Sequence, residues 1–77
     1  MRFSELRRLA ESLDCQAVSE DDKVMLADSR SLVHATIPNG EFGVYELSTW
    51  MGSGFPKSLM IAALDFAYTD PEYRMED

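Results

Sequence analysis

The sequence predicts an α+β fold: a small antiparallel meander of three to four strands, with an N-terminal and a C-terminal helix packed on one face (α-β-β-β-α). Three observations lead to this prediction. Apolar residues recur at helical spacing near the N-terminus. Short β-branched segments separated by turn residues fill the middle of the chain. The longest apolar stretch, 56–69, begins with a proline, as helices often do.

The first helix is predicted from about Ser4 to Leu13. Ser4 stands where an N-cap belongs, and Glu5 places a negative charge in the first turn, where the helix dipole favours it. Its apolar side recurs every three or four positions and consists of Phe3, Leu6, Leu9, Ala10 and Leu13. The arginines that follow the apolar positions, Arg7 and Arg8, are expected on the outer side.

The middle of the chain predicts strands at 23–27, 32–37 and 41–47, with a short edge strand at 16–18. Asn39-Gly40 is the strongest hairpin signal, because both residues tolerate positive φ. The connections are too short for the crossovers that parallel strands need, so the sheet should be an antiparallel meander.

One face of this sheet should pack on the helices, and side chains alternate between the two faces of a strand. We therefore expect Val33, Ala35 and Ile37 to face the core. His34, Thr36 and Tyr45 are then expected on the opposite face, open to solvent or to a partner.

The last helix is predicted from Lys57 to Thr69, because Pro56 suits the first helical position and the residue before Pro71 disfavours helix. Residues 70–77 are expected to form a polar, frayed tail. The helix is apolar around most of its circumference, so we expect it either to lie deep in the core or to be covered by a second subunit along an outer arc that includes Met60 and Tyr68.

The segment before this helix, 48–55, combines glycine and serine with large apolar residues, among them Trp50, Met51 and Phe55. Apolar residues in such a loop cap the open end of a small core, or they contact a partner. Both interpretations stay open on the sequence alone.

Length and composition predict one domain, 1–77, with a thin core. The chain has one cysteine, Cys15, so it cannot form an internal disulfide. It also has one histidine, so a metal site of histidine and cysteine would need further ligands. No apolar stretch reaches the roughly 18–20 residues of a membrane span, and the first residues, 1–5, lack the apolar core of a signal peptide. We therefore expect a cytoplasmic protein without a membrane partner.

The sequence contains no complete motif for catalysis, cofactor binding or metal binding. Gly52–Ser58 has the glycines and the Lys-Ser of a phosphate loop, but Pro56 stands where that loop needs glycine. A triad around His34 would need partners that are distant in sequence, and Asp14 beside Cys15 works against a reactive thiol. We expect no enzyme activity, no cofactor and no metal.

The net charge of −7 argues against direct nucleic-acid binding, which needs clustered lysine and arginine. The residues Glu20, Asp21 and Asp22 form a candidate acidic surface. Such a run is normally a solvated face, and it has too few ligands for an EF-hand. The alternative is a surface that imitates the phosphates of DNA.

The chain ends in Tyr68-Thr69-Asp70-Pro71-Glu72-Tyr73-Arg74 after a helix, strands and an apolar helix. In this order and ending it resembles small uncharacterised proteins encoded by phages and prophages of Gram-positive bacteria. Here Asp70 separates the threonine from the proline of that ending. The resemblance implies a host-directed or structural role in a phage or mobile element, and it assigns no functional residues.

Together these features predict a small, acidic, non-enzymatic interaction protein that acts through contacts with a protein partner or through self-association as a homodimer. The candidate interface residues are Trp50, Met51, Met60 and Tyr68. The alternative function is an acidic inhibitor that occupies a nucleic-acid-binding surface of a host protein.

Overall fold

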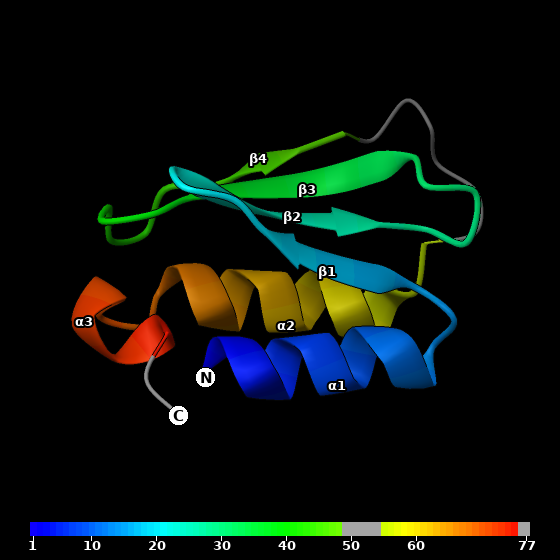
Figure 1. The fold of residues 1–77 in the computed structure, drawn as a ribbon, viewed down its shortest axis with the longest axis horizontal. Helices are drawn as coiled ribbons and strands as arrows, with labels where there is room; N and C mark the ends of the chain where they lie inside the picture. Colours follow the sequence, from blue (N-terminus) through cyan, green and yellow to red (C-terminus); the bar gives the residue numbers. More distant parts are fainter. Residues whose placement is uncertain (49–54, 76–77) are drawn as a thin grey trace.

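The computed structural model describes residues 1–48 and 55–75. The elements in these residues follow in the order α1 (Phe3–Ser12), β1 (Gln16–Ser19), β2 (Lys23–Ala27), β3 (Val33–Pro38), β4 (Glu46–Leu47), α2 (Lys57–Ala67) and α3 (Pro71–Arg74). The strands form one antiparallel sheet in the order β1-β2-β3-β4. Both long helices lie against the same face of this sheet (Figure 1). The predicted α+β class and meander are confirmed, with β1 as the fourth strand.

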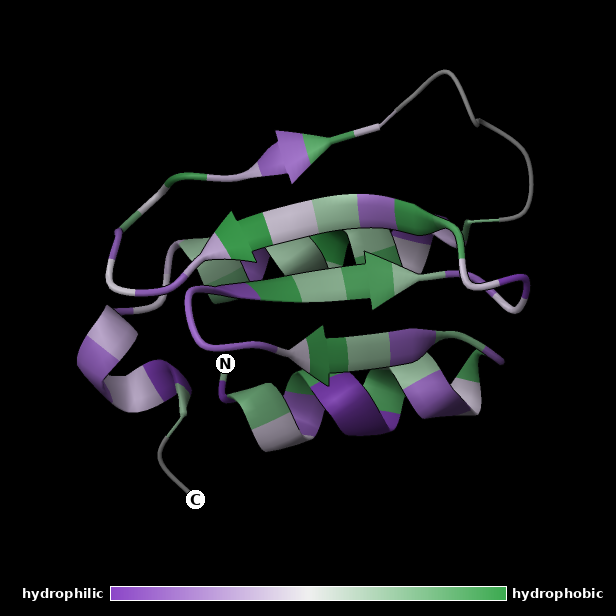
Figure 2. Cartoon of the chain, turned by 45° about the horizontal axis from the view of Figure 1, so that its top comes forward, coloured by the Kyte–Doolittle hydropathy of each residue, from purple (hydrophilic) through white to green (hydrophobic). Residues whose placement is uncertain are grey.

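The core lies between the sheet and the two long helices. Side chains of α1, β2, β3 and α2 meet there, and the fully buried apolar ones include Leu6, Val24, Leu26, Ile37, Leu59 and Phe66. Each such aliphatic or aromatic side chain contributes on the order of 1.5–3 kcal/mol by burial. In Figure 2, α1 carries alternating hydrophobic and hydrophilic bands, as expected for a helix with one face on a core.

The start of α1 differs by one residue from the prediction. The helix begins at Phe3, and Arg2 rather than Ser4 occupies the N-cap position. The carboxylate of Glu5 accepts a hydrogen bond from the Arg2 backbone N–H at 3.0 Å. This contact satisfies one of the free N–H groups that every helix N-terminus leaves.

The predicted faces of β3 are wrong at its first two residues. Leu26 pairs with Ala35 and Ala27 pairs with Val33, so His34 is an extra residue on β3, a β-bulge. The bulge interrupts the alternation of side chains. As a result His34 is buried with 1% of its surface exposed, whereas Val33 exposes 39%. Ala35 and Ile37 are buried, as predicted.

The strand predicted at 41–47 is shorter, because β4 spans only Glu46–Leu47. Gly43 has a φ of +73°, a left-handed conformation that favours glycine. Its backbone N–H donates to the carbonyl of Ala67 at 2.7 Å, at the end of α2. The segment between β3 and β4 (residues 39–45, the β3–β4 loop) therefore satisfies a free carbonyl of α2 instead of extending the sheet.

The helix α2 agrees with the predicted range to within a few residues, and Pro56 occupies its N-cap position. The segment predicted as a frayed tail instead contains the short helix α3. Asp70 caps it by accepting from the Glu72 N–H at 3.0 Å. Arg74 at its end is buried with 1% exposure, which fixes α3 on the body of the protein.

The N-terminal amino group donates to Oγ1 of Thr69 at 2.8 Å, so the start of the chain lies beside the end of α2. In the part of the chain that the structure describes, no helix has the length and apolar character needed to cross a membrane.

Candidate functional site

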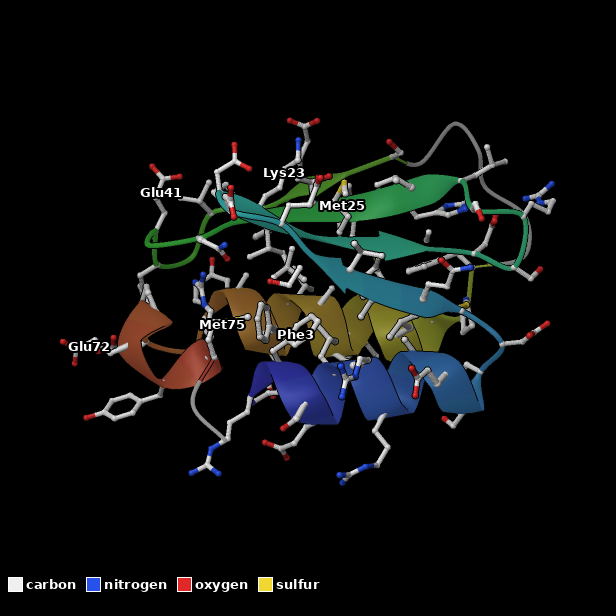
Figure 3. The ribbon with its side chains drawn as sticks, viewed as in Figure 1. Phe3, Lys23, Met25, Glu41, Glu72 and Met75 are labelled. Carbon is white, nitrogen blue, oxygen red and sulfur yellow. The ribbon has the colours of Figure 1, made fainter. Side chains whose placement is uncertain are left out.

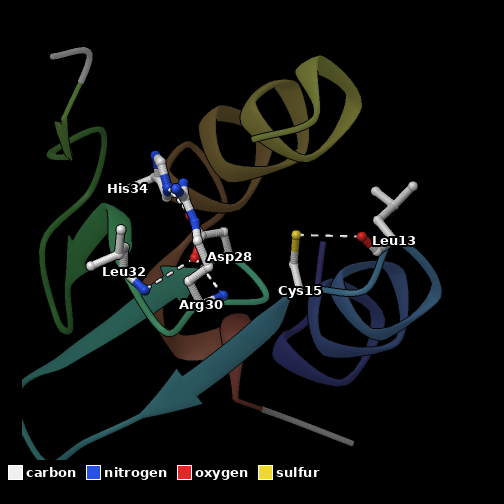
Figure 4. A network of polar contacts seen from close by, with 6 residues as sticks. All are labelled: Leu13, Cys15, Asp28, Arg30, Leu32 and His34. Carbon is white, nitrogen blue, oxygen red and sulfur yellow. Dashed lines mark hydrogen bonds and ion pairs between the residues drawn. The ribbon is translucent and has the colours of Figure 1, made fainter. Parts of the chain in front are cut away.

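Three residues, Asp28, Arg30 and His34, are here called the polar cluster; the first two lie in the turn between β2 and β3, and His34 lies at the start of β3 (Figure 4). Oδ1 of Asp28 accepts from the backbone N–H groups of Arg30 (2.8 Å) and Leu32 (3.1 Å). Oδ2 of Asp28 lies 2.7 Å from Nε2 of His34 and 2.9 Å from Nη2 of Arg30. Because an ionised carboxylate only accepts, Nε2 of His34 is the donor. The hydrogen bond from His34, helped by those from Arg30 and Leu32, holds the pKa of Asp28 well below its ordinary range.

The ring of His34 also stacks on Phe55, with centroids 4.6 Å apart and planes 17° from parallel. Phe55 directly precedes Pro56 and the start of α2, and it packs against the hydrophobic core. Through His34 and Phe55, the polar cluster therefore connects the β2–β3 turn to the N-terminus of α2. For Phe55, this agrees with the interpretation of the 48–55 segment as a cap on the core.

Cys15 carries the one thiol of the chain, and its surroundings work against reactivity. The thiol is buried and donates to the Leu13 carbonyl at 3.5 Å. Burial, with Asp28 and Asp14 as smaller causes, raises the pKa of the Cys15 thiol. In residues 1–48 and 55–75, the side-chain partner of His34 is Asp28, and no serine or cysteine side chain bonds to the ring. The polar cluster therefore holds the fold together and forms no nucleophilic triad in this part of the chain.

The structure also places large apolar side chains on the surface, between the β3–β4 loop and α2. The aromatic patch is defined here as Phe42, Tyr45, Ile61 and Tyr68. Phe42 meets Tyr68 edge-to-face at a centroid distance of 5.7 Å, and Tyr45 lies 6.3 Å from Tyr68. Ile61 precedes Tyr68 by two turns of α2 and so shares its face.

The aromatic patch remains largely open to solvent. The exposed fractions are 60% for Phe42, 56% for Ile61, 56% for Tyr68 and 40% for Tyr45. Gly43 holds the loop close to this patch, since a Cβ at Gly43 would lie 3.2 Å from the Tyr68 ring. The loop rings Phe42 and Tyr45 are thus held against Tyr68 at the end of α2, with the Gly43–Ala67 backbone hydrogen bond fixing the loop.

Three acidic segments meet at one end of the molecule. The side-chain amide of Asn39 donates to the Glu20 carbonyl at 3.2 Å, and the Asn39 N–H donates to the Asp22 carbonyl at 2.8 Å. Arg74 donates to the carbonyls of Pro38 and Glu41, which attaches α3 to the same loop. The exposed carboxylates gathered here, called the acidic end, are Glu20, Asp21, Asp22, Glu41, Asp70 and Glu72. Figure 3 shows Glu41 and Glu72 at this end.

The residues predicted from the sequence are placed as follows. Tyr68 lies in the aromatic patch, whereas Met60 is only half-exposed on α2. Trp50 and Met51 lie outside the described residues. Glu20, Asp21 and Asp22 are exposed in the turn between β1 and β2, and the structure joins them to three further carboxylates.

Sequence reasoning missed Phe42 and Ile61 as surface candidates. Tyr45 was expected on the open face of a strand, and it is exposed in the β3–β4 loop instead. The two-turn spacing of Ile61 and Tyr68 was a usable signal, since it places both on one helix face. The role of Phe42 was hidden, because the predicted strand at 41–47 assigned it to the sheet.

Within the described ranges, no group of three or more histidine, cysteine, aspartate or glutamate side chains is arranged to hold a metal ion. Comparison with protein-family models, curated proteins and solved structures found no match.

Proposed function

We propose that this chain is a non-enzymatic interaction protein that binds another protein chain through the aromatic patch. The observation that supports this most strongly is the exposed contact between Phe42 and Tyr68, with the exposed Ile61 two turns away on the same face of α2. Contiguous exposed apolar surface in a small soluble protein commonly marks an interaction site. Aromatic residues are also enriched among the side chains that dominate binding energy.

The experiment compares the proteins that the wild type captures from a cell lysate with those captured by a variant in which two patch side chains are replaced by alanine. In the variant Ile61→Ala/Tyr68→Ala, alanine preserves the helix while removing two exposed apolar anchors. The control is Val18→Ala/Val33→Ala, which truncates two apolar side chains that are also exposed, on β1 and β3 and away from the patch. We expect captured proteins to be lost with the first variant and kept with the control, at unchanged melting temperatures. An identical set of captured proteins with all three chains would refute the proposal.

A second candidate function is an acidic inhibitor that occupies a basic, nucleic-acid-binding surface. The observation that favours it is the gathering of carboxylates from three separate segments at the acidic end. The discriminating variant is Glu20→Gln/Asp21→Asn/Asp22→Asn. An inhibitor of this kind loses binding with this variant and with rising salt, but it keeps binding with Ile61→Ala/Tyr68→Ala. Salt-independent binding would exclude it.

We place this activity in the cytoplasm, where the buried thiol of Cys15 stays reduced. A role directed at a host protein, as the likeness to phage-encoded proteins implies, fits a small chain whose exposed features are a patch for binding and a strong negative charge.

A further inference from the structure

We infer that the occupant of the aromatic patch is an amphipathic helix of a different protein, with basic residues beside its apolar anchors. This inference rests on the proposed function of the patch and adds the chemistry of the partner. It follows from where the patch lies, which charges surround it and how long its helical part is.

The aromatic patch adjoins the acidic end at Glu41 and Asp70. Phe42 directly follows Glu41, and Tyr68 lies two positions before Asp70. One guanidinium, that of Arg74, donates both to the Glu41 carbonyl and to the Ala67 carbonyl beside Tyr68. The two segments that supply the rings are therefore held next to the segments that supply the carboxylates.

The charges next to the patch are mainly negative. Glu41, Asp65 and Asp70 are exposed, and Asp65 shares the outer side of α2 with Ile61 and Tyr68. The cations near this surface are Lys57, which is exposed about one turn before Ile61, and the N-terminal ammonium, which donates to Oγ1 of Thr69. Arg74 lies beneath this surface, but its guanidinium is buried and directed at backbone carbonyls. A partner with lysine or arginine around its apolar anchors would complement this pattern.

A second copy of the chain fits the same surface poorly. Each copy carries a net charge of −7, and a symmetric contact through the patch would bring the surrounding carboxylates of both copies into one interface. Like charges that face each other across an interface oppose binding. The exposed arginines Arg7 and Arg8 lie on α1 among polar residues, so that face offers the aromatic patch few apolar anchors.

The shape of the patch favours a helical partner. Ile61, the half-exposed Leu64 and Tyr68 follow one another along α2 over about 10 Å, from the helical rise per residue. A ridge of this kind accepts another helix by packing side chains between its own. About two turns of an amphipathic helix would cover it, with the basic residues reaching the acidic end.

The test measures binding of a fluorescent helical peptide of leucine and lysine that has one apolar face. Two comparison peptides carry glutamate in place of lysine, or the same residues scrambled so that no apolar face forms. We expect the first peptide to bind the wild type, to bind at least tenfold more weakly to Ile61→Ala/Tyr68→Ala, and to weaken as salt rises. The control Val18→Ala/Val33→Ala should bind it like the wild type. The comparison peptides should bind at least tenfold more weakly than the first.

Equal binding of the acidic or the scrambled peptide, or no binding of the first peptide, would overturn the inference. So would a concentration-dependent dimer in sedimentation that dissociates in Ile61→Ala/Tyr68→Ala, because the occupant would then be a second copy. In any of these cases, loss of lysate proteins with that variant would still support the proposed function. If the lysate proteins are unaffected as well, the proposed function fails with the inference.

Discussion

The guanidinium of Arg74 lies over the ring of Phe66, 5.4 Å from its centroid. Phe66 is a fully buried residue of the core, and Arg74 is nearly as buried. The guanidinium donates to the carbonyls of Thr69, Pro38, Glu41 and Ala67, which belong to segments far apart in the sequence. Burial lowers the pKa of Arg74, but arginine stays charged in proteins, so these carbonyls must take the place of water.

Replacing Arg74 with methionine should therefore destabilise the protein by about 3 kcal/mol, because several buried carbonyls lose their donor while most of the packing remains. The stability of Arg74→Lys should lie between those of the wild type and Arg74→Met, since a lysine ammonium cannot donate to carbonyls on so many sides. Urea unfolding at neutral pH measures both. The exposed Arg8→Met on α1 is the control and should change stability by less than about 0.5 kcal/mol. A loss no greater than that of the control would contradict the structural role of Arg74.

The polar cluster predicts a loss of stability in acid. The pKa of Asp28 is depressed in the folded state, so the unfolded chain binds the proton more readily. The contribution of Asp28 is therefore fully present above the ordinary aspartate pKa of about 3.9, and it is lost as the pH falls toward the depressed value. Asp28→Asn should be less stable than the wild type at neutral pH, and the difference should shrink on acidification.

Urea midpoints across an acid pH series test this expectation. The exposed turn residue Asp21 provides the control, because Asp21→Asn should follow the wild type at each pH. A constant difference between Asp28→Asn and the wild type from neutral to strongly acid pH would show that the carboxylate of Asp28 is not stabilised by its hydrogen bonds.

The thiol of Cys15 should react slowly in the folded protein. Burial raises its pKa, as do the charges of Asp28 and Asp14, so the thiolate fraction at neutral pH is smaller than in an unfolded chain. We expect alkylation by iodoacetamide at least tenfold slower in buffer than in urea. Mass spectrometry follows the modified fraction. Rapid labelling without denaturant would contradict the buried position of Cys15.

The fold class followed from the sequence because its signals are local. The helical spacing of Leu6 and Ala10 acts over a few residues and agrees with the structure. A turn forms at Asn39-Gly40, but it is not the tight hairpin that was predicted, because the next strand begins only at Glu46. His34 was misplaced because a β-bulge depends on the pairing of two strands, which a single strand's alternation cannot reveal. Because the sequence does not reveal the bulge, it could not predict the hydrogen bond between His34 and Asp28.

The candidate surface was predicted only in part, and for a similar reason. Tyr68 was predicted as a surface candidate because α2 is apolar around most of its circumference, and the sheet and α1 cannot cover all of it. Phe42 was not, since its position depends on Gly43 bonding to the end of α2, a contact between residues distant in sequence. The acidic end likewise depends on Asn39 and Arg74, whose donors join three segments that are separate in the sequence.

Gly43→Ala should change both the stability and the aromatic patch. The φ of +73° is strained for alanine by about 1–2 kcal/mol, and the added Cβ would lie 3.2 Å from the Tyr68 ring. Gly40→Ala is the matched control, because its φ of +79° brings the same backbone cost while its Cβ meets nothing within 4 Å. We expect both variants to lose stability in urea unfolding, but only Gly43→Ala to alter the near-ultraviolet circular dichroism of the tyrosines. Identical spectra for the two variants would show that Gly43 does not hold the Tyr68 ring in place.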